Sequence, residues 1–434
     1  MIVISEDRTF TTLSSSNLKE LILMQGSAWS PVMPPSLAKN KDIVNALPFD
    51  GISIIGDKWT REVFVPDNVV TYEDVIGELA PLKDQLTKTK NYLNINTDFP
   101  GSVFDDDVWK QVKANWVAVA KAAKYMGYSG ILYDNESYRR PEEPFPGHSG
   151  ATVTGGGYLT NVLFPFKDDV DADPDSFAAW QINGSRHISG SFDDISHSRW
   201  WVDYKKNPSG VIRPNAFDAA SAGHTFQETV DKTESRFKEI MQALVAVFPT
   251  IKVLVAHGMF ESNNNVPVYV SGLTHVTGCH DLVGACIYGL IKGTEQTGAV
   301  VVDLGENYKY RTAAHFKNAY QWRKYDMMSV ENNTVRSNSE QWEWTVPVSF
   351  AGKPNIGFMT HNLATSSPDD EFDTHGSSTP EDIKNATIYA LQQTDSIVVY
   401  YTESQNWLDP DASNWVPNDW KDALQDAYDS ISSD

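Results

Sequence analysis

The sequence predicts a (β/α)8 barrel, a closed ring of parallel strands covered by helices. Short, β-rich apolar runs alternate with longer segments of helical periodicity, a pattern typical of parallel βαβ units. Eight such units can be counted along the 434 residues. One barrel needs about 250 residues, so this length leaves room for insertions. We therefore interpret residues 1–434 as one barrel domain, and two average domains are the alternative.

The expected strands are short and apolar, as barrel strands are. They are Leu21 to Gln25, Gly51 to Ile55, Tyr92 to Thr97, Gly130 to Glu136, Val253 to His257, Ala299 to Asp303, Ile356 to His361 and Ile397 to Glu403. The clearest helices are expected over 107–126, from about Phe226 to Pro249, from a Thr379 N-cap, and from about Asn418. Further helices are expected over 38–46 and 72–86.

Two segments do not fit the repeating unit. Residues 139–222 follow the fourth strand and are too long for a plain loop, so we expect a β-rich insertion subdomain there. Residues 329–353 contain QWEWTVPVSF and are expected to add a hairpin before the seventh strand. Such insertions shape substrate sites at the C-terminal face of a barrel.

The composition fits a soluble globular protein, with 41% apolar and 21% charged residues. A net charge of −22 disfavours nucleic acid and anionic membranes as partners, because both require basic residues. The chain shows no secretory signal and no apolar stretch long enough to cross a membrane. An extracellular or virion-associated role is compatible with this, and the compartment and the oligomeric state stay open. Cys279 and Cys286 lie about 10 Å apart along a predicted helix, too far for a disulfide.

The strongest candidate active site is at the end of the fourth strand. Side chains alternate along a strand, so Leu132, Asp134 and Glu136 share one face. If this face lines the barrel, two neighbouring carboxylates raise each other's pKa, and Glu136 can hold a proton for donation. The alternative is a solvated or helix-capping acidic loop.

A second carboxylate, Glu403, ends the eighth strand in phase with Tyr401. Cleavage of a glycosidic bond needs groups on both sides of that bond, and carboxylates from different strand ends meet this need. For Glu403, an ion pair or hydrogen bond in the barrel rim is the alternative. Trp407 follows closely, and an indole face there would suit stacking on a sugar ring.

Other polar and aromatic residues near strand ends are candidates for substrate binding. They are Tyr138, His257, Asp303, Glu306, Tyr308 and His361. The histidines are scattered along the sequence, and the two cysteines do not have the close spacing of a metal-binding pair. No metal is therefore expected. No cofactor is expected either, because serine-hydrolase, P-loop and dinucleotide-binding motifs are absent.

The GILYDNE segment resembles the fourth strand of chitinase-like family 18 glycoside hydrolases, which ends in G-x-D-x-D-x-E. Gly130, Asp134 and Glu136 match, whereas Leu132 replaces the first aspartate. The resemblance implies Glu136 as the acid and Asp134 as the residue that orients the N-acetyl group of the substrate. More broadly, LKELILMQGSAWSP, LPFDGISI, VVVDLGENYKY and VVYYTESQNW resemble bacterial barrel proteins assigned as glycoside hydrolases.

The sequence thus predicts a glycoside hydrolase acting on a polysaccharide or oligosaccharide. Glu136 is the expected acid, Asp134 tunes and orients it, and Glu403 is the opposite carboxylate. A non-catalytic carbohydrate-binding barrel and a polysaccharide lyase or metal-dependent hydrolase are the alternatives. The sugar, the linkage, internal or terminal attack, and a retaining, inverting or substrate-assisted course stay open, and a depolymerase role is a further hypothesis.

Overall fold

The computed structural model describes residues 19–25, 30–65, 68–96, 103–135, 226–256, 281–305, 310–321, 324, 355–362, 379–402 and 405–432. Within these ranges the chain forms one sheet of nine parallel strands, in the order β7-β6-β5-β4-β3-β2-β1-β9-β8. The strands are β1 (Glu20–Gln25), β2 (Gly51–Ile54), β3 (Tyr92–Asn96), β4 (Gly130–Asp134), β5 (Lys252–Val255), β6 (Val300–Asp303), β7 (Asn355–Ile356), β8 (Phe358–Asn362) and β9 (Ile397–Thr402).

The two strands at the ends of this order belong to one stretch of chain, and this stretch closes the barrel. β7 pairs with β6 and β8 pairs with β9, with Gly357 between them. The Gly357 amide donates to the Asp303 carbonyl at 2.9 Å. A Cβ at Gly357 would lie 2.8 Å from the side chains of Val302 and Leu304, so a glycine fits here. Residues 355–362 therefore act as the seventh of eight barrel strands, and the predicted (β/α)8 fold is confirmed.

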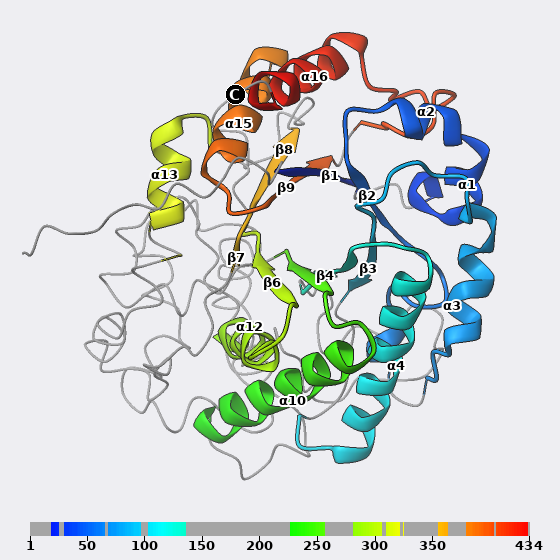
Figure 1. The fold of residues 1–434 in the computed structure, drawn as a ribbon, viewed down its shortest axis with the longest axis vertical. Helices are drawn as coiled ribbons and strands as arrows, with labels where there is room; N and C mark the ends of the chain where they lie inside the picture. Colours follow the sequence, from blue (N-terminus) through cyan, green and yellow to red (C-terminus); the bar gives the residue numbers. More distant parts are fainter. Residues whose placement is uncertain are drawn as a thin grey trace, which may run out of the picture.

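The helices surround the ring of strands, as Figure 1 shows. They are α1 (Pro34–Lys39), α2 (Lys41–Ala46), α3 (Tyr72–Leu79), α4 (Asp106–Tyr125), α10 (Phe226–Val247), α12 (Asp281–Gly293), α13 (Ala313–Gln321), α15 (Pro380–Gln393) and α16 (Asn418–Ser432). Short 3-10 turns lie at Ser30–Val32, Glu62–Phe64 and Ala80–Leu82.

The helix boundaries follow local chemistry. Thr379 caps α15 in a reciprocal capping box with Asp382, so the predicted N-cap is confirmed. Asp105 accepts hydrogen bonds from the amides of residues 107 and 108, and α4 therefore begins one residue earlier than predicted. The predicted helix over 72–86 is shorter: α3 ends at Leu79 and a 3-10 turn containing Pro81 follows. The predicted helix over 38–46 is two helices that meet at Asn40.

Side chains alternate along each strand between two hydrophobic cores. One core lies between the strands and the helices and includes Ile131, Tyr133 and Val301. The other fills the barrel lumen and includes Leu132 and Val302, together with Ile22, Met24, Tyr92, Leu254, Ala256, Leu304, Met359, Ile397 and Val399. The barrel is therefore a packed core, and polar side chains on the lumen face need hydrogen-bonding partners.

Two polar networks lie at the N-terminal ends of the strands, the base of the barrel. In the first, Glu20 of β1 pairs with Lys252 of β5 at 2.7 Å and with Lys90 at 3.3 Å. The Tyr92 hydroxyl donates to the same carboxylate at 3.3 Å. Burial, with the nearby Glu20 charge, raises the pKa of Tyr92 well above its usual range.

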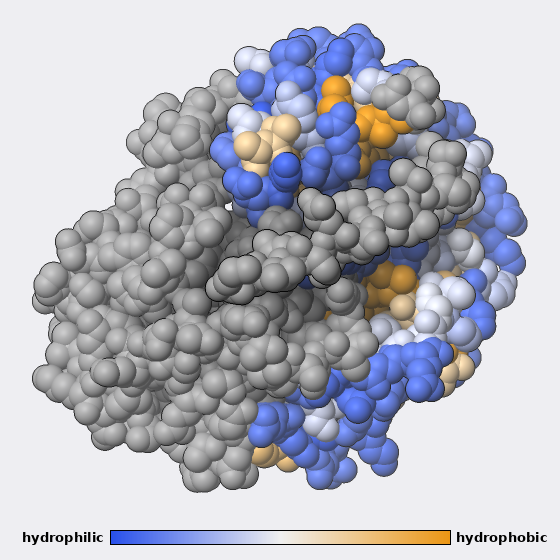
Figure 2. All heavy atoms as spheres, turned by 60° about the vertical axis from the view of Figure 1, so that its left-hand side comes forward, coloured by the Kyte–Doolittle hydropathy of each residue, from blue (hydrophilic) through white to orange (hydrophobic). Residues whose placement is uncertain are grey.

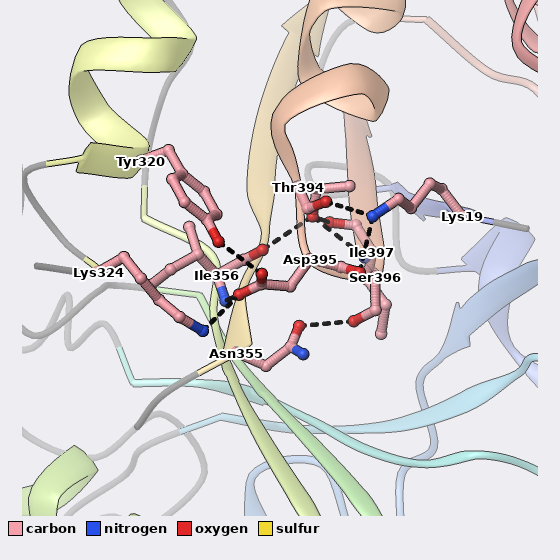
Figure 3. Close-up of polar contacts among 9 residues, drawn as sticks. All are labelled: Lys19, Tyr320, Lys324, Asn355, Ile356, Thr394, Asp395, Ser396 and Ile397. Carbon is pink, nitrogen blue, oxygen red and sulfur yellow. Dashed lines mark hydrogen bonds and ion pairs between the residues drawn. The ribbon is translucent and has the colours of Figure 1, made fainter. Parts of the chain in front are cut away.

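The second network surrounds Asp395, just before β9, and Figure 3 shows it in detail. The Asp395 carboxylate accepts hydrogen bonds from the Tyr320 hydroxyl at 2.7 Å, the Lys324 ammonium at 2.8 Å and the Ile356 amide at 2.8 Å. Lys19 donates to the backbone carbonyl of Asp395 at 2.8 Å. This carboxylate therefore joins α13, β7 and β9 at the end of the barrel opposite Asp134.

The described surface is mainly hydrophilic in the view of Figure 2, where hydrophobic atoms appear as small areas among polar ones. Among the described helices, none combines the length and the hydropathy that crossing a bilayer requires. Cys286 of α12 is a buried free thiol, and burial raises its pKa well above the usual range.

Candidate active site

Asp134 is the last residue of β4, at the C-terminal end of the barrel, where the catalytic groups of such barrels lie. It shares the lumen face with Leu132, as the strand alternation predicted. Only 8% of Asp134 is exposed. The Asn96 side-chain amide donates to the Asp134 carboxylate at 3.2 Å, and the strand register sets these two residues side by side. The fold therefore aims a buried carboxylate into the lumen at the C-terminal end of the barrel.

Asn94 and Asn96 extend this polar strip down the lumen face of β3. The Asn94 amide donates to the Ser53 hydroxyl at 3.2 Å, as the Asn96 amide does to Asp134. Among the described residues, the Oδ1 atoms of both asparagines are buried and lack a hydrogen-bond donor. A carboxylate can only accept, so the Asn96 amide nitrogen must face Asp134 and its Oδ1 must point away. Both oxygens are thus buried acceptors without a donor among the described residues.

Sequence reasoning missed these two asparagines, although a signal for them was present. In YLNINT, Asn94 and Asn96 alternate with Leu93 and Ile95, both of which lie in the outer core. Two amides in phase on a buried strand indicate a polar strip on the opposite face, because a buried amide without a partner is costly.

Tyr401 of β9 reaches the same end of the barrel as Asp134. It is partly buried against the lumen core, and it pairs in register with Met24 of β1 and His361 of β8. Tyr401 therefore lies on the lumen face, as its phase predicted. The backbone of His361 belongs to β8, whereas its side chain lies outside what the structure describes.

Asp303 does not face the lumen, so its assignment as a cleft residue is wrong. Val302 and Leu304 on either side belong to the lumen core, and Val301 belongs to the outer core. The alternation therefore directs Asp303 to the helix side of β6, where it is 2% exposed.

Trp407 is also not a sugar-stacking residue, because it is fully buried. Its indole packs edge-on against Phe49 and Tyr400, with ring centroids 5.4 Å away in each case. The segment after β9 folds back, and Asn406 forms a bridge with Trp415. This fold-back turns Trp407 into the outer core.

The remaining predicted site residues lie outside the described residues. They are Glu136, Tyr138, His257, Glu306, Tyr308 and Glu403, and the predicted insertions at 139–222 and 329–353 lie there too. Among the described residues, no three His, Cys, Asp or Glu side chains are grouped as a metal site would require.

Comparisons with known proteins found solved structures that are similar to this one. No protein-family model matches the sequence, and no curated protein matches it. The catalytic domain of β-amylase from Paenibacillus polymyxa is similar with a TM-score of 0.42 and 9% identity, covering 94% of this chain and 98% of the other. The β-mannanase of the blue mussel Mytilus edulis is similar with a TM-score of 0.41 and 12% identity, covering 95% of each chain.

A sugar phosphate isomerase/epimerase from Parabacteroides distasonis is also similar, with a TM-score of 0.36 and 9% identity, covering 95% of this chain and 97% of that one. At these identities the likeness concerns the fold alone.

Proposed function

We propose that this protein is a glycoside hydrolase that cleaves a polysaccharide or oligosaccharide at the C-terminal end of its barrel. The observation that carries this proposal is Asp134, a buried lumen carboxylate held by Asn96, two residues before Glu136. If the strand alternation continues past Asp134, Glu136 shares its face. A proton donor beside a fixed negative charge is the arrangement that glycosidic cleavage requires.

In the proposed reaction, Glu136 gives its proton to the glycosidic oxygen as the bond from that oxygen to the anomeric carbon breaks. Water supplies the hydroxyl that the anomeric carbon gains and the proton that restores Glu136. Asp134 keeps its charge beside Glu136, which raises the proton affinity of Glu136. Asn96 holds the Asp134 carboxylate in place, and we assign the opposite carboxylate to Glu403.

The first test is the release of reducing sugar from a panel of neutral, amino and acidic polysaccharides. The wild type should release sugar from at least one of them. Glu136→Gln should reduce the rate by about 100-fold to 10,000-fold, because general acid catalysis contributes about that much. Glu403→Gln distinguishes two routes: a similar loss indicates two carboxylates, and a small loss indicates that a substrate group assists.

The matched control is Glu295→Gln, which changes an exposed glutamate near the base of the barrel. Its rate should equal that of the wild type. A fully active Glu136→Gln variant would contradict the proposed acid. Saccharide binding without product from any polymer would favour a non-catalytic binding barrel, and loss of activity with a chelator would favour a metal-dependent enzyme.

A further inference from the structure

A groove crosses the outside of the barrel above α4, between the start of α3 and the end of α10. Its volume is about 1140 Å³. The floor consists of Ala114, Val117 and Ala118 of α4 with Ala243 and Val247 of α10. We call this feature the α4 groove. It lies on the helix layer, and so it is separate from the lumen face that carries Asp134.

Lysines border the floor of the α4 groove at both ends. Lys110 and Lys113 lie at one end and Lys121 and Lys124 at the other. A helix rises 1.5 Å per residue, so this row spans about 21 Å. Lys110 and Lys121 are exposed, and neither has an ion-pair partner within the described ranges. Lys113 pairs with Glu239 at 3.2 Å, and Glu73 also lines the groove, so Lys110 and Lys121 supply the exposed positive charge here, in a chain with a net charge of −22.

Exposed apolar side chains lie beside these lysines. In the described part of the chain, the exposed large hydrophobic side chains are Val69 at 59% and Tyr125 at 52%. Tyr125 lines the groove, and Val69 precedes the lining residue Val70. Exposed apolar surface bordered by charge is typical of a protein interface. It favours a polypeptide partner over an anionic polysaccharide, which would need the lysines but not the apolar floor.

We propose that the α4 groove binds an amphipathic α-helix of a partner protein, with its apolar stripe on the floor and aspartate or glutamate residues along its flanks. The small side chains of Ala114, Ala118 and Ala243 let a second helix approach to the usual interaxial distance of about 8–10 Å. The exposed lysines then face the acidic flanks, which adds specificity and speeds association. This surface is independent of the proposed glycoside hydrolysis.

The test is the binding of a fluorescent peptide of about 18 residues to the full-length protein, measured by anisotropy. The peptide carries leucine at helical spacing with glutamate on both flanks. A second peptide has glutamine in place of each glutamate, and a third has the first composition in scrambled order. The first peptide should bind at least about tenfold more tightly than either control, and added salt should weaken it.

Protein variants locate the binding surface. Ala114→Arg fills the floor at an exposed helix position, and Lys121→Glu reverses one border charge, so each should weaken binding by about tenfold. The matched control is Lys317→Glu on α13, an exposed lysine on a distant helix, which should leave binding unchanged. Equal binding of the three peptides, or no effect of Ala114→Arg, would overturn the proposal. Binding of polygalacturonate in place of the peptide would overturn it in favour of an anionic polysaccharide.

Discussion

Asp395 is a residue whose side chain joins several separate segments at the base of the barrel. It accepts from a helix hydroxyl, an ammonium group and a strand amide, and all three donors come from 39 or more residues away in the chain. The Lys324 and Asp395 side chains are 17% and 21% exposed, so water screens this pair little. A charged acceptor with three donors contributes more to stability than a surface ion pair does.

We therefore expect Asp395→Asn to lower the free energy of unfolding by about 2 kcal/mol, because Lys324 loses its partner and one acceptor becomes a donor. Urea unfolding followed by circular dichroism measures this change. The control is Asp426→Asn, which breaks an ion pair with Lys384 whose side chains are 31% and 61% exposed. That control should cost less than about 0.5 kcal/mol. Equal losses in both variants would contradict this role of Asp395.

The site residues differ in how well the sequence could predict them. Asp134 and Tyr401 were placed correctly because strand alternation is local and continues to the last residue of each strand. Asp303 obeys the same rule, and its prediction as a substrate-binding residue did not apply that rule: its phase with Val301 already assigned it to the helix side. Trp407 could not be placed, because its burial depends on a bridge between Asn406 and Trp415, nine residues apart.

At the scale of elements, the strands were the most predictable part, because a buried parallel strand is a short run of β-branched and aromatic residues. All eight predicted runs contain a barrel strand. The helix ends were less predictable where two effects compete. Over 72–86, apolar periodicity continues after Leu79, but Pro81 interrupts the helix. The division of the seventh strand at Gly357 arises because β7 pairs with β6 and β8 pairs with β9, and no local sequence pattern indicates that division.

Gly130, the first residue of β4, must be a glycine because the backbone of β5 lies too close for a side chain. A Cβ at this position would lie 1.9 Å from the Lys252 carbonyl oxygen, a backbone atom that cannot move without shifting the strand pair. We expect Gly130→Ala to lower the stability by about 3 kcal/mol or more. Thermal and urea unfolding measure the loss, and the candidate site should suffer as well, because Asp134 ends the same strand.

The matched control for Gly130 is Gly77 of α3, where an added Cβ would meet no other atom within 4 Å. Gly77→Ala should raise the stability by about 0.5–1 kcal/mol, because alanine loses less backbone entropy in a helix. Gly130→Ala with wild-type stability would show that β4 and β5 can separate at no cost. A destabilised Gly77→Ala would show instead that α3 tolerates no side chain there.

At the scale of the whole molecule, stability depends on closure of the ring. β1 and β9 pair over six residues from Glu20 to Gln25, which joins the first strand to the last. Glu20 adds a link across the lumen to Lys252 of β5, about half-way around the barrel. This side chain therefore connects the two halves of the ring through its interior, whereas the strand pairs connect them only around the circumference.

We expect Glu20→Gln to destabilise both halves together by about 2 kcal/mol, because Lys252 and Lys90 lose their shared counter-charge at the base of the lumen. Native-state hydrogen exchange can measure each half separately, through the amides of β3 to β5 and those of β8, β9 and β1. Protection should fall equally in both groups, since a closed barrel opens as one unit. The control Asp411→Asn removes an exposed pair with Lys39, with side chains 81% and 68% exposed, and should leave protection unchanged. A loss of protection confined to β1 would mean that Glu20 holds only its own strand and that the halves of the barrel unfold independently.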